Sequence, residues 1–364
     1  GALALALGAR EQNIQKLYTA PDNGTEMKHG FGGDVVVASS LKDLVAMVLG
    51  KIPEIMAKPA TQGTHSLQRL ADFSEVKGQI IAKKALEIAA AGGHHVLLTG
   101  SPGAGKTMLA KAMPSILPPL TEEEQLSISR IYSVAGLLPT EGLMQVRPFR
   151  SPHHTITLAG MAGGGSIPKP GELTLSHEGV LFLDEAPEFS RSVLEVLRQP
   201  LEEGVIHISR ANGTFSYPCR FILLMAMNPC PCGWHDGGEG HTCTCTPWQI
   251  ESYVKRLSGP LLDRIDMVIH VTRPTYEELQ AVGDAETSAT IRERVISARE
   301  IQRKRSIALH FSDGNRVLLN SELSHRQLML ACEVTDEAQQ VLAQTFQNLD
   351  ISIRSYDKIL RVAR

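Results

Sequence analysis

Residues 100–107 constrain the fold of this chain more than any other segment does. They spell Gly-Ser-Pro-Gly-Ala-Gly-Lys-Thr, a complete G-x-x-x-x-G-K-T motif. An apolar stretch suited to a β-strand, residues 96–99, precedes the motif, and residues 108–112 favour a helix. This context suits a phosphate-binding loop, because backbone N–H groups of the loop and the N-terminus of the helix both attract anions. A chance glycine-rich turn is the alternative, and the flanking segments argue against it.

The residues of this loop have expected roles in binding ATP. Backbone N–H groups are expected to wrap the phosphates, Lys106 to reach the β- and γ-phosphates, and Thr107 to ligate Mg²⁺ through its hydroxyl. The predicted nucleotide-binding residues of the loop are Gly100, Ser101, Pro102, Gly103, Ala104, Gly105, Lys106, Thr107 and Met108.

Two further apolar segments end in polar side chains that fit the same chemistry. Residues 180–183 lead to Asp184 and Glu185, which we predict to face the magnesium ion and to position the attacking water. Residues 221–227 lead to Asn228, whose amide is suited to holding that water. The alternatives are a strand that ends in a solvated turn for the two carboxylates, and turn capping for Asn228.

The order of segments predicts an α/β fold. Short apolar strands alternate with helical stretches between residues 72 and 272, as in a parallel sheet covered by helices on both faces. Both ends of the sequence resemble unfinished helices, so we expect a fragment of a longer polypeptide. The expected divisions are a first unit at 1–50, a linker at 51–71, the core at 72–272 with a cysteine-rich insertion at 229–248, and a helical subdomain at 273–364.

The clustering of cysteines predicts a metal site. Four thiolates in one short stretch can satisfy one tetrahedral zinc ion. Their C-x-C spacing is tighter than the usual C-x-x-C, so His235 or His241 in place of a thiolate, and unligated cysteines, stay open as alternatives. The predicted zinc ligands are Cys230, Cys232, Cys243 and Cys245.

The net charge and the hydropathy of the chain limit which partners, DNA or a membrane, it can be expected to bind. The formal net charge is −3, from 36 Lys and Arg against 39 Asp and Glu, so a DNA-binding surface would have to come from a local cluster of basic residues. The apolar opening, residues 1–8, is too short for a membrane span and lacks the basic flank of a signal peptide. We therefore expect a cytoplasmic protein without membrane association.

Several motifs together resemble a known family. The order of phosphate loop, acidic strand end, Asn228 and residues 259–266 is similar to that of AAA+ ATPases. More narrowly, residues 147–155 (RPFRSPHHT), 163–172 (GGGSIPKPGE) and 227–233 (MNPCPCG) resemble the magnesium-chelatase-like ComM/YifB family. The resemblance implies an AAA+ P-loop NTPase core with a parallel sheet, a C-terminal helical lid, and ATP and Mg²⁺ as ligands.

The resemblance also extends to the beginning of the chain and to the two sides of the nucleotide. Residues 1–50 resemble the C-terminal part of a Lon-protease-like α+β domain (ribosomal S5 domain 2-like), without a protease Ser–Lys pair. Val76, Gly78 and Gln79 match the segment that lines the adenine pocket. In the lid, Arg354 resembles the sensor 2 arginine, and Arg361 is the other candidate; that helix, with Tyr-Asp-Lys at 356–358, is more acidic than the resemblance leads us to expect.

Arg264 matches the arginine finger, which the family supplies across a subunit boundary. A guanidinium can stabilise the charge that develops on the γ-phosphate. The alternative is a surface ion pair with Asp263 or Asp266. The resemblance thus implies a homo-oligomer, specifically a hexamer.

The leading functional hypothesis is a DNA-translocating motor, a hexameric helicase that drives branch migration in homologous recombination and natural transformation. The alternatives are a chelatase-type ATPase subunit that assists magnesium insertion, and a protein unfoldase. Residues 205–217 predict two strands joined by a turn, where related motors carry a hairpin in the pore of the ring. We expect Arg210 on this hairpin and Lys169 in the glycine-rich insertion to contact DNA phosphates. An exposed hairpin with a solvated arginine is the alternative, and the adjacent pair His153 and His154 is expected to be structural.

Overall fold

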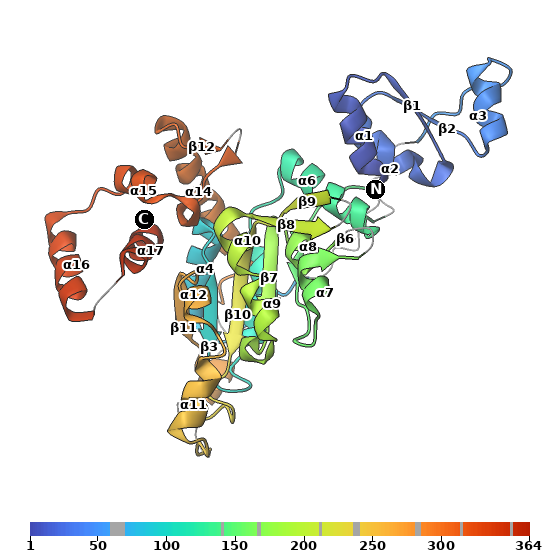
Figure 1. Ribbon diagram of the computed structural model, residues 1–364. Coiled ribbons are helices and arrows are strands. Elements are labelled where there is room, and N and C mark those ends of the chain that lie inside the picture. Colours follow the sequence, from blue (N-terminus) through green and yellow to red (C-terminus); the bar gives the residue numbers. More distant parts are fainter. Residues whose placement is uncertain are drawn as a thin grey trace.

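The centre of the molecule is a parallel sheet, shown in Figure 1. The computed structural model of the chain describes residues 1–58, 70–139, 142–165, 169–210, 213–235, 241–280, 285–313, 316–349 and 352–364. Within these residues the sheet has five strands in the order β11–β3–β10–β7–β4, and each neighbouring pair is parallel. The strands are β3 (Val96–Thr99), β4 (Phe149–Arg150), β7 (Gly179–Leu183), β10 (Phe221–Met227) and β11 (Met267–His270). The predicted α/β fold with a parallel sheet is confirmed.

Residues of the central strands alternate between two apolar layers. In β7, Val180 and Phe182 belong to a cluster on one face of the sheet, whereas Leu181 and Leu183 belong to a cluster on the other. This alternation arises because successive side chains of a strand point to opposite faces. Every residue of β7 and β10 is buried, which explains why both strands are continuous apolar runs in the sequence.

Helices cover both faces of this sheet. Leu86 of α4, Leu109 of α5 and Ile291 of α14 pack in the first layer, and Val193 of α9 and Leu261 of α12 pack in the second. Because α14 shares a layer with α5, the helix that follows the phosphate loop is tied directly to the C-terminal region. The bounds of these helices are α4 (Ile80–Gly92), α5 (Lys106–Ile116), α9 (Arg191–Glu195), α12 (Gly259–Leu262) and α14 (Ser288–Ala308).

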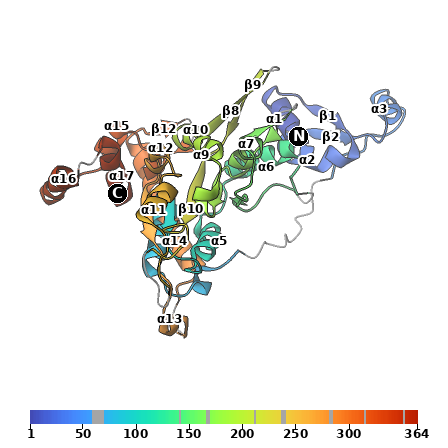
Figure 2. The same ribbon diagram turned by 60° about the horizontal axis from the view of Figure 1, so that its bottom comes forward.

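Two antiparallel hairpins and several short helices are inserted between the strands of the core. The hairpin of β8 (Val205–Arg210) and β9 (Gly213–Pro218) projects beyond the body of the core in Figure 2. The smaller hairpin of β5 (Gly163–Gly164) and β6 (Lys169–Pro170) touches it, since a Cβ on Gly163 would lie 2.9 Å from Ile208 Cδ1. The inserted helices are α6 (Glu122–Ala135), α7 (Leu158–Ala162), α8 (Glu172–Leu175), α10 (Arg198–Glu203) and α11 (Pro247–Val254), with a short 3₁₀ turn at Ala186–Glu188. Another 3₁₀ turn, Phe73–Glu75, precedes α4.

The first residues form a small unit beside α6. Its two strands pair in parallel, and Phe31 and Val35 lie in its own apolar cluster. The carboxylate of Glu26 accepts hydrogen bonds from Leu3 N at 2.8 Å and from the Ser133 hydroxyl of α6, which joins the unit to the core. The elements are α1 (Ala2–Glu11), β1 (Lys16–Thr19), α2 (Pro21–Phe31), β2 (Asp34–Val37) and α3 (Leu41–Val48).

The C-terminal region is mostly helical. Leu328 of α15 and Leu360 of α17 share an apolar cluster with Phe311. No helix in the part of the chain that the structure describes has the length and hydrophobicity to cross a membrane. The remaining elements are α13 (Tyr276–Gln280), β12 (Ser312–Asp313), β13 (Arg316–Val317), a 3₁₀ turn at Asn320–Glu322, α15 (His325–Ala331), α16 (Asp336–Leu349) and α17 (Ile353–Ala363).

Candidate nucleotide-binding site

The phosphate loop connects β3 to α5 and surrounds the ammonium group of Lys106. Lys106 Nζ donates to the carbonyl oxygens of Gly100 at 2.6 Å and Ser101 at 3.0 Å, and to Asn228 Oδ1 at 3.1 Å. Burial lowers the pKa of Lys106, and the carboxylates of Asp184 and Glu185 oppose this effect. The lysine is therefore held inside the loop by neutral acceptors that a phosphate group can replace.

Two glycines give the loop its shape. Gly105 has φ 96°, in the left-handed region that glycine adopts without strain, and it leads directly into α5. A Cβ on Gly100 would clash with the carbonyl oxygen of Val271, which follows β11. Glycine at position 100 thus allows the loop to pass close beside the end of the neighbouring strand.

Side chains at the carboxyl ends of β7 and β10 meet the loop. Thr107 Oγ1 donates to Asp184 Oδ2 at 2.8 Å, so the two predicted magnesium ligands are in contact. Glu185 has φ 51°, and its side chain is 58% exposed. This backbone conformation, rare for a non-glycine residue, turns the carboxylate away from the strand toward solvent, where a water molecule has access to it.

The predicted adenine side is built from the segment before α4. Gln79 Nε2 donates to Ala104 O at 3.1 Å and also to Thr272 O, which ties this segment to the phosphate loop and to the end of β11. Val76 is buried in the first apolar layer. Gly78 has φ 60°, and a Cβ there would lie 3.1 Å from the Glu278 carboxylate.

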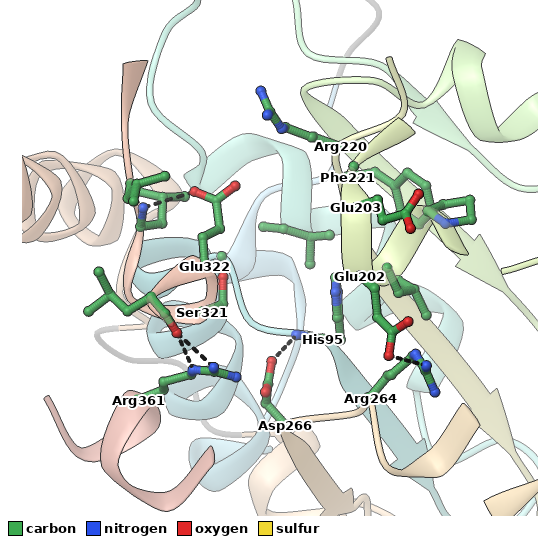
Figure 3. Close-up of a pocket in the computed structure, with 18 of the residues that line it drawn as sticks. His95, Glu202, Glu203, Arg220, Phe221, Arg264, Asp266, Ser321, Glu322 and Arg361 are labelled. Carbon is green, nitrogen blue, oxygen red and sulfur yellow. Dashed lines mark hydrogen bonds and ion pairs between the residues drawn. The ribbon is translucent and has the colours of Figure 1, made fainter. Parts of the chain in front are cut away.

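Arg264 lies at the opposite edge of the sheet from the phosphate loop of its own chain. It precedes the amino end of β11, whereas the loop follows the carboxyl end of β3, and these two strands are parallel. Its guanidinium pairs with Glu202 and donates to Pro260 O, as Figure 3 shows for Glu202. The acidic partner is thus Glu202, while Asp266 accepts a hydrogen bond from His95 N at 2.9 Å.

Arg264 is one of the residues that line a cavity of about 540 Å³ at this amino edge (Figure 3). Arg354 and Arg361 of α17 both line it, together with Lys358. Arg361 is engaged within its own subdomain, because its Nε and Nη2 donate to Leu323 O at 3.0 and 2.7 Å. Arg354 is therefore a better candidate than Arg361 for contacting the nucleotide site of a second subunit.

The four predicted zinc ligands come together in the structure. Their sulfur atoms all lie within 4.8 Å of one another, and none forms a disulfide. The Sγ–Sγ distances are 3.3 Å for Cys230–Cys232, 3.8 Å for Cys230–Cys243 and 3.6 Å for Cys232–Cys243. Backbone N–H groups of Thr244 and Trp234 lower the pKa of Cys232 to about 6, whereas desolvation and contacts with the other thiols raise the pKa of Cys245 to about 12.

Sequence comparisons agree with this geometry. The profile of the family described as magnesium chelatase, subunit ChlI, matches residues 72–279, and that of the ChlI C-terminal region matches residues 285–364. The chain is 41% identical to the uncharacterized protein YifB of Escherichia coli strain K12, over 100% of this chain and 69% of YifB. It is 40% identical to the competence protein ComM of Haemophilus influenzae strain Rd, over 99% of this chain and 69% of ComM. The chain belongs to the magnesium-chelatase-like ComM/YifB family.

Members of the ComM/YifB family are AAA+ ATPases, so the family implies ATP and Mg²⁺ as ligands. The chain spans about two thirds of the length of these two bacterial relatives. A more distant similarity, 26% identity over 49% of this chain and 18% of the relative, links it to the DNA helicase MCM8 of Bos taurus.

The structure describes the side chain of only one of the two residues that are predicted to contact DNA. Lys169 is exposed on β6. Arg210 is the last residue of β8, but its side chain and the turn residues 211–212 lie outside the described part of the molecule.

Sequence reasoning missed two side chains that lie beside this candidate site. His154 Nδ1 lies 3.9 Å from Glu185 Oε2, although the sequence predicts a structural role for the adjacent histidines. Arg273 donates to the carbonyl oxygen of Pro102 at the tip of the phosphate loop. His154 lies within the family motif at 147–155, which gave it no part in catalysis, and Arg273 lies outside the named motifs. The parallel order of strands, which places the segments after β4, β7 and β11 at one edge, could have suggested both.

Proposed function

We propose that the chain is the motor part of an ATP-driven AAA+ ring that moves DNA, and that the ring is a hexameric branch-migration helicase in homologous recombination and natural transformation. The observation that carries the proposal is the division of the site between the two edges of the sheet. Lys106, Asp184, Glu185 and Asn228 converge at the carboxyl edge, and Arg264 lies at the amino edge.

The carboxyl edge would bind and hydrolyse ATP. Lys106 would exchange its loop carbonyls for the β- and γ-phosphates, while Thr107 and Asp184 would hold Mg²⁺, which neutralises phosphate charge when bound. The exposed Glu185 would orient the attacking water. Asn228, whose Oδ1 now accepts from Lys106, would contact the same water from β10.

The amino edge would complete the site of a neighbouring subunit. Arg264 cannot serve the loop of its own chain, because parallel strands place the two at opposite edges. Arg354 would act beside it from the lid, residues 273–364. An arginine supplied in trans typically raises the rate of related hydrolases by about 10³ or more.

Two touching hairpins would form the DNA-contacting element. The β8–β9 hairpin leaves the core between β7 and β10, the strands that end at Asp184 and Asn228. A movement of these strands during hydrolysis would reach the hairpin directly. Two relatives, named as a competence protein and a DNA helicase, support DNA as the substrate.

The cysteine cluster would hold a structural zinc ion. A tetrahedral zinc site with Zn–S bonds of about 2.3 Å places its sulfurs about 3.8 Å apart. The sulfur separations of 3.3, 3.6 and 3.8 Å are close to this value, and the group of ligand atoms found among the described residues consists of the four thiols alone.

A filter-binding assay with forked and four-way DNA, at low salt and with a non-hydrolysable ATP analogue, tests the proposed function. We expect binding that weakens steeply as salt rises, since phosphate contacts release counterions. An ATPase that binds none of these DNAs under any salt condition would instead support the chelatase-type alternative, which the family description also allows.

A further inference from the structure

The cysteine cluster lies directly beside the phosphate loop. The chain leaves β10, passes Asn228, which contacts Lys106, and reaches Cys230 and Cys232 within four residues. Gly233 then packs on the loop, because a Cβ there would lie 2.6 Å from Pro102 Cδ. With φ 85°, this glycine is also in the left-handed region, so a side chain is disfavoured for two reasons.

Trp234 connects the cysteine loop to Arg273. Its ring stacks on His241 with 3.9 Å between centroids and an angle of 15° between planes. The guanidinium carbon of Arg273 lies 4.6 Å from the centroid of the same ring, within range of a cation–π interaction. Trp234 follows Cys232 by two residues and His241 precedes Cys243 by two. An ion that joins these two cysteines would therefore fix the backbones that carry both rings.

Arg273 in turn fixes one peptide group of the phosphate loop. Its Nη2 and Nε donate to Pro102 O at 2.8 and 3.2 Å. The carbonyl and the following N–H of a trans peptide point in opposite directions. Holding the Pro102 carbonyl toward Arg273 therefore turns the N–H of Gly103 to the other side, where loop N–H groups can donate to phosphate.

We propose that the ion bound by the four cysteines supports the phosphate loop, and that Arg273 is the positioning residue through which it acts. The ion is a thiophilic divalent cation, and Zn²⁺ suits the four-thiolate donor set. It holds Trp234 in place, Trp234 holds Arg273, and Arg273 orients the Pro102–Gly103 peptide for nucleotide. The inference rests on the proposed role of residues 100–107 in binding ATP.

Zinc removal is the first experiment. The chain is prepared with Zn²⁺ bound and, in parallel, stripped with a zinc-selective chelator, and both are titrated with a fluorescent ATP analogue in excess Mg²⁺. We expect the stripped protein to bind the analogue about threefold to tenfold more weakly, and added Zn²⁺ to restore the affinity. Zinc content by elemental analysis and thermal unfolding are followed in the same samples, so that loss of the global fold is recognised.

Substitutions that leave the cysteines intact form the second experiment. Arg273→Gln should weaken binding of the analogue about tenfold, because it removes the charge-assisted hydrogen bonds to Pro102. Zinc removal should then have no further effect, since residues of one relay are not additive. Trp234→Leu should weaken binding about threefold, whereas Trp234→Phe, which keeps an aromatic face, should stay close to the parent.

Trp248→Phe is the matched control and also a reporter. Trp248 is 73% exposed on α11, and the chain has 2 tryptophans, so this variant leaves Trp234 as the sole indole. Its nucleotide affinity should equal that of the parent. The emission of Trp234 should shift when Zn²⁺ is removed.

Three outcomes would overturn the proposal. They are a chain that takes up no Zn²⁺, a folded stripped protein that binds nucleotide as tightly as the loaded one, and an Arg273→Gln variant with parental affinity. A loaded parent that binds no nucleotide at all would remove the ATP site itself, and the inference with it.

Discussion

Thr107 and Asp184 share a hydrogen bond of 2.8 Å between Thr107 Oγ1 and Asp184 Oδ2, although the strands that lead to them, β3 and β7, are separated by β10 in the sheet. The oxygen atoms proposed to bind Mg²⁺ are thus already adjacent. Metal binding would therefore require little movement of these two side chains. The role of each site residue can be tested by its own substitution.

Lys106→Ala and Glu185→Gln should have different effects. Lys106 contacts phosphate in the ground state, so its loss should weaken ATP binding. Glu185 acts on the attacking water, so Glu185→Gln should keep ATP bound and lower kcat by about 10² or more. Equilibrium binding and steady-state hydrolysis, measured side by side, separate the two. Hydrolysis at the parental rate by Glu185→Gln would show that another group positions the water.

Turnover should depend on assembly. Arg264→Ala should abolish most hydrolysis while leaving ATP affinity nearly unchanged. Mixing it with Lys106→Ala subunits should restore part of the activity, at interfaces that combine an intact loop with an intact arginine. Activity is measured across mixing ratios, with mixed assemblies verified by differential tagging. Verified mixed assemblies that stay inactive would contradict action in trans.

The hairpin residues should govern affinity for DNA. Lys169→Ala and Arg210→Ala should each weaken DNA binding at low salt. Each should also lower the slope of log K against log[salt] by about one, because each substitution removes one positive side chain that contacts a DNA phosphate. Lys255→Ala removes the exposed lysine that follows α11, paired with Glu251, and is the control for loss of charge alone. A salt slope that falls equally in the control would assign the effect to net charge.

His177 should make stability fall in mild acid. Burial, with a contribution from Arg220, lowers the pKa of His177 to about 3 from a usual value of 6.5. Between these values the unfolded chain binds a proton that the folded chain does not, so the free energy of unfolding decreases as pH drops, by up to about 1.4 kcal/mol per pH unit. Urea midpoints at pH 7.5 and about pH 5.5 measure the slope. His177→Gln should flatten it, and an unchanged slope would exclude His177 as its source.

Much of the core could be predicted because its signals are local in sequence. The apolar runs that became β7 and β10 are buried on both faces, and the phosphate loop carries its own strand and helix. The contact between Arg273 and Pro102 could not be predicted, since it joins residues 171 positions apart that meet only after β11 has paired with β3. The pairing of Arg264 with Glu202 depends likewise on where α10 packs.

The placement of Arg264 and the phosphate loop at opposite edges of one sheet also decides how complete sites are counted in an assembly. Each proposed contact runs head to tail, so an open row of subunits always leaves its last phosphate loop without a neighbour's arginine. Only closure into a ring removes that end. Ring closure could therefore be detected without an image of the particle. Tightly bound nucleotide would be measured in particles of different mass, and the fraction of subunits that lack a complete site should fall to zero only at the subunit number of the closed ring.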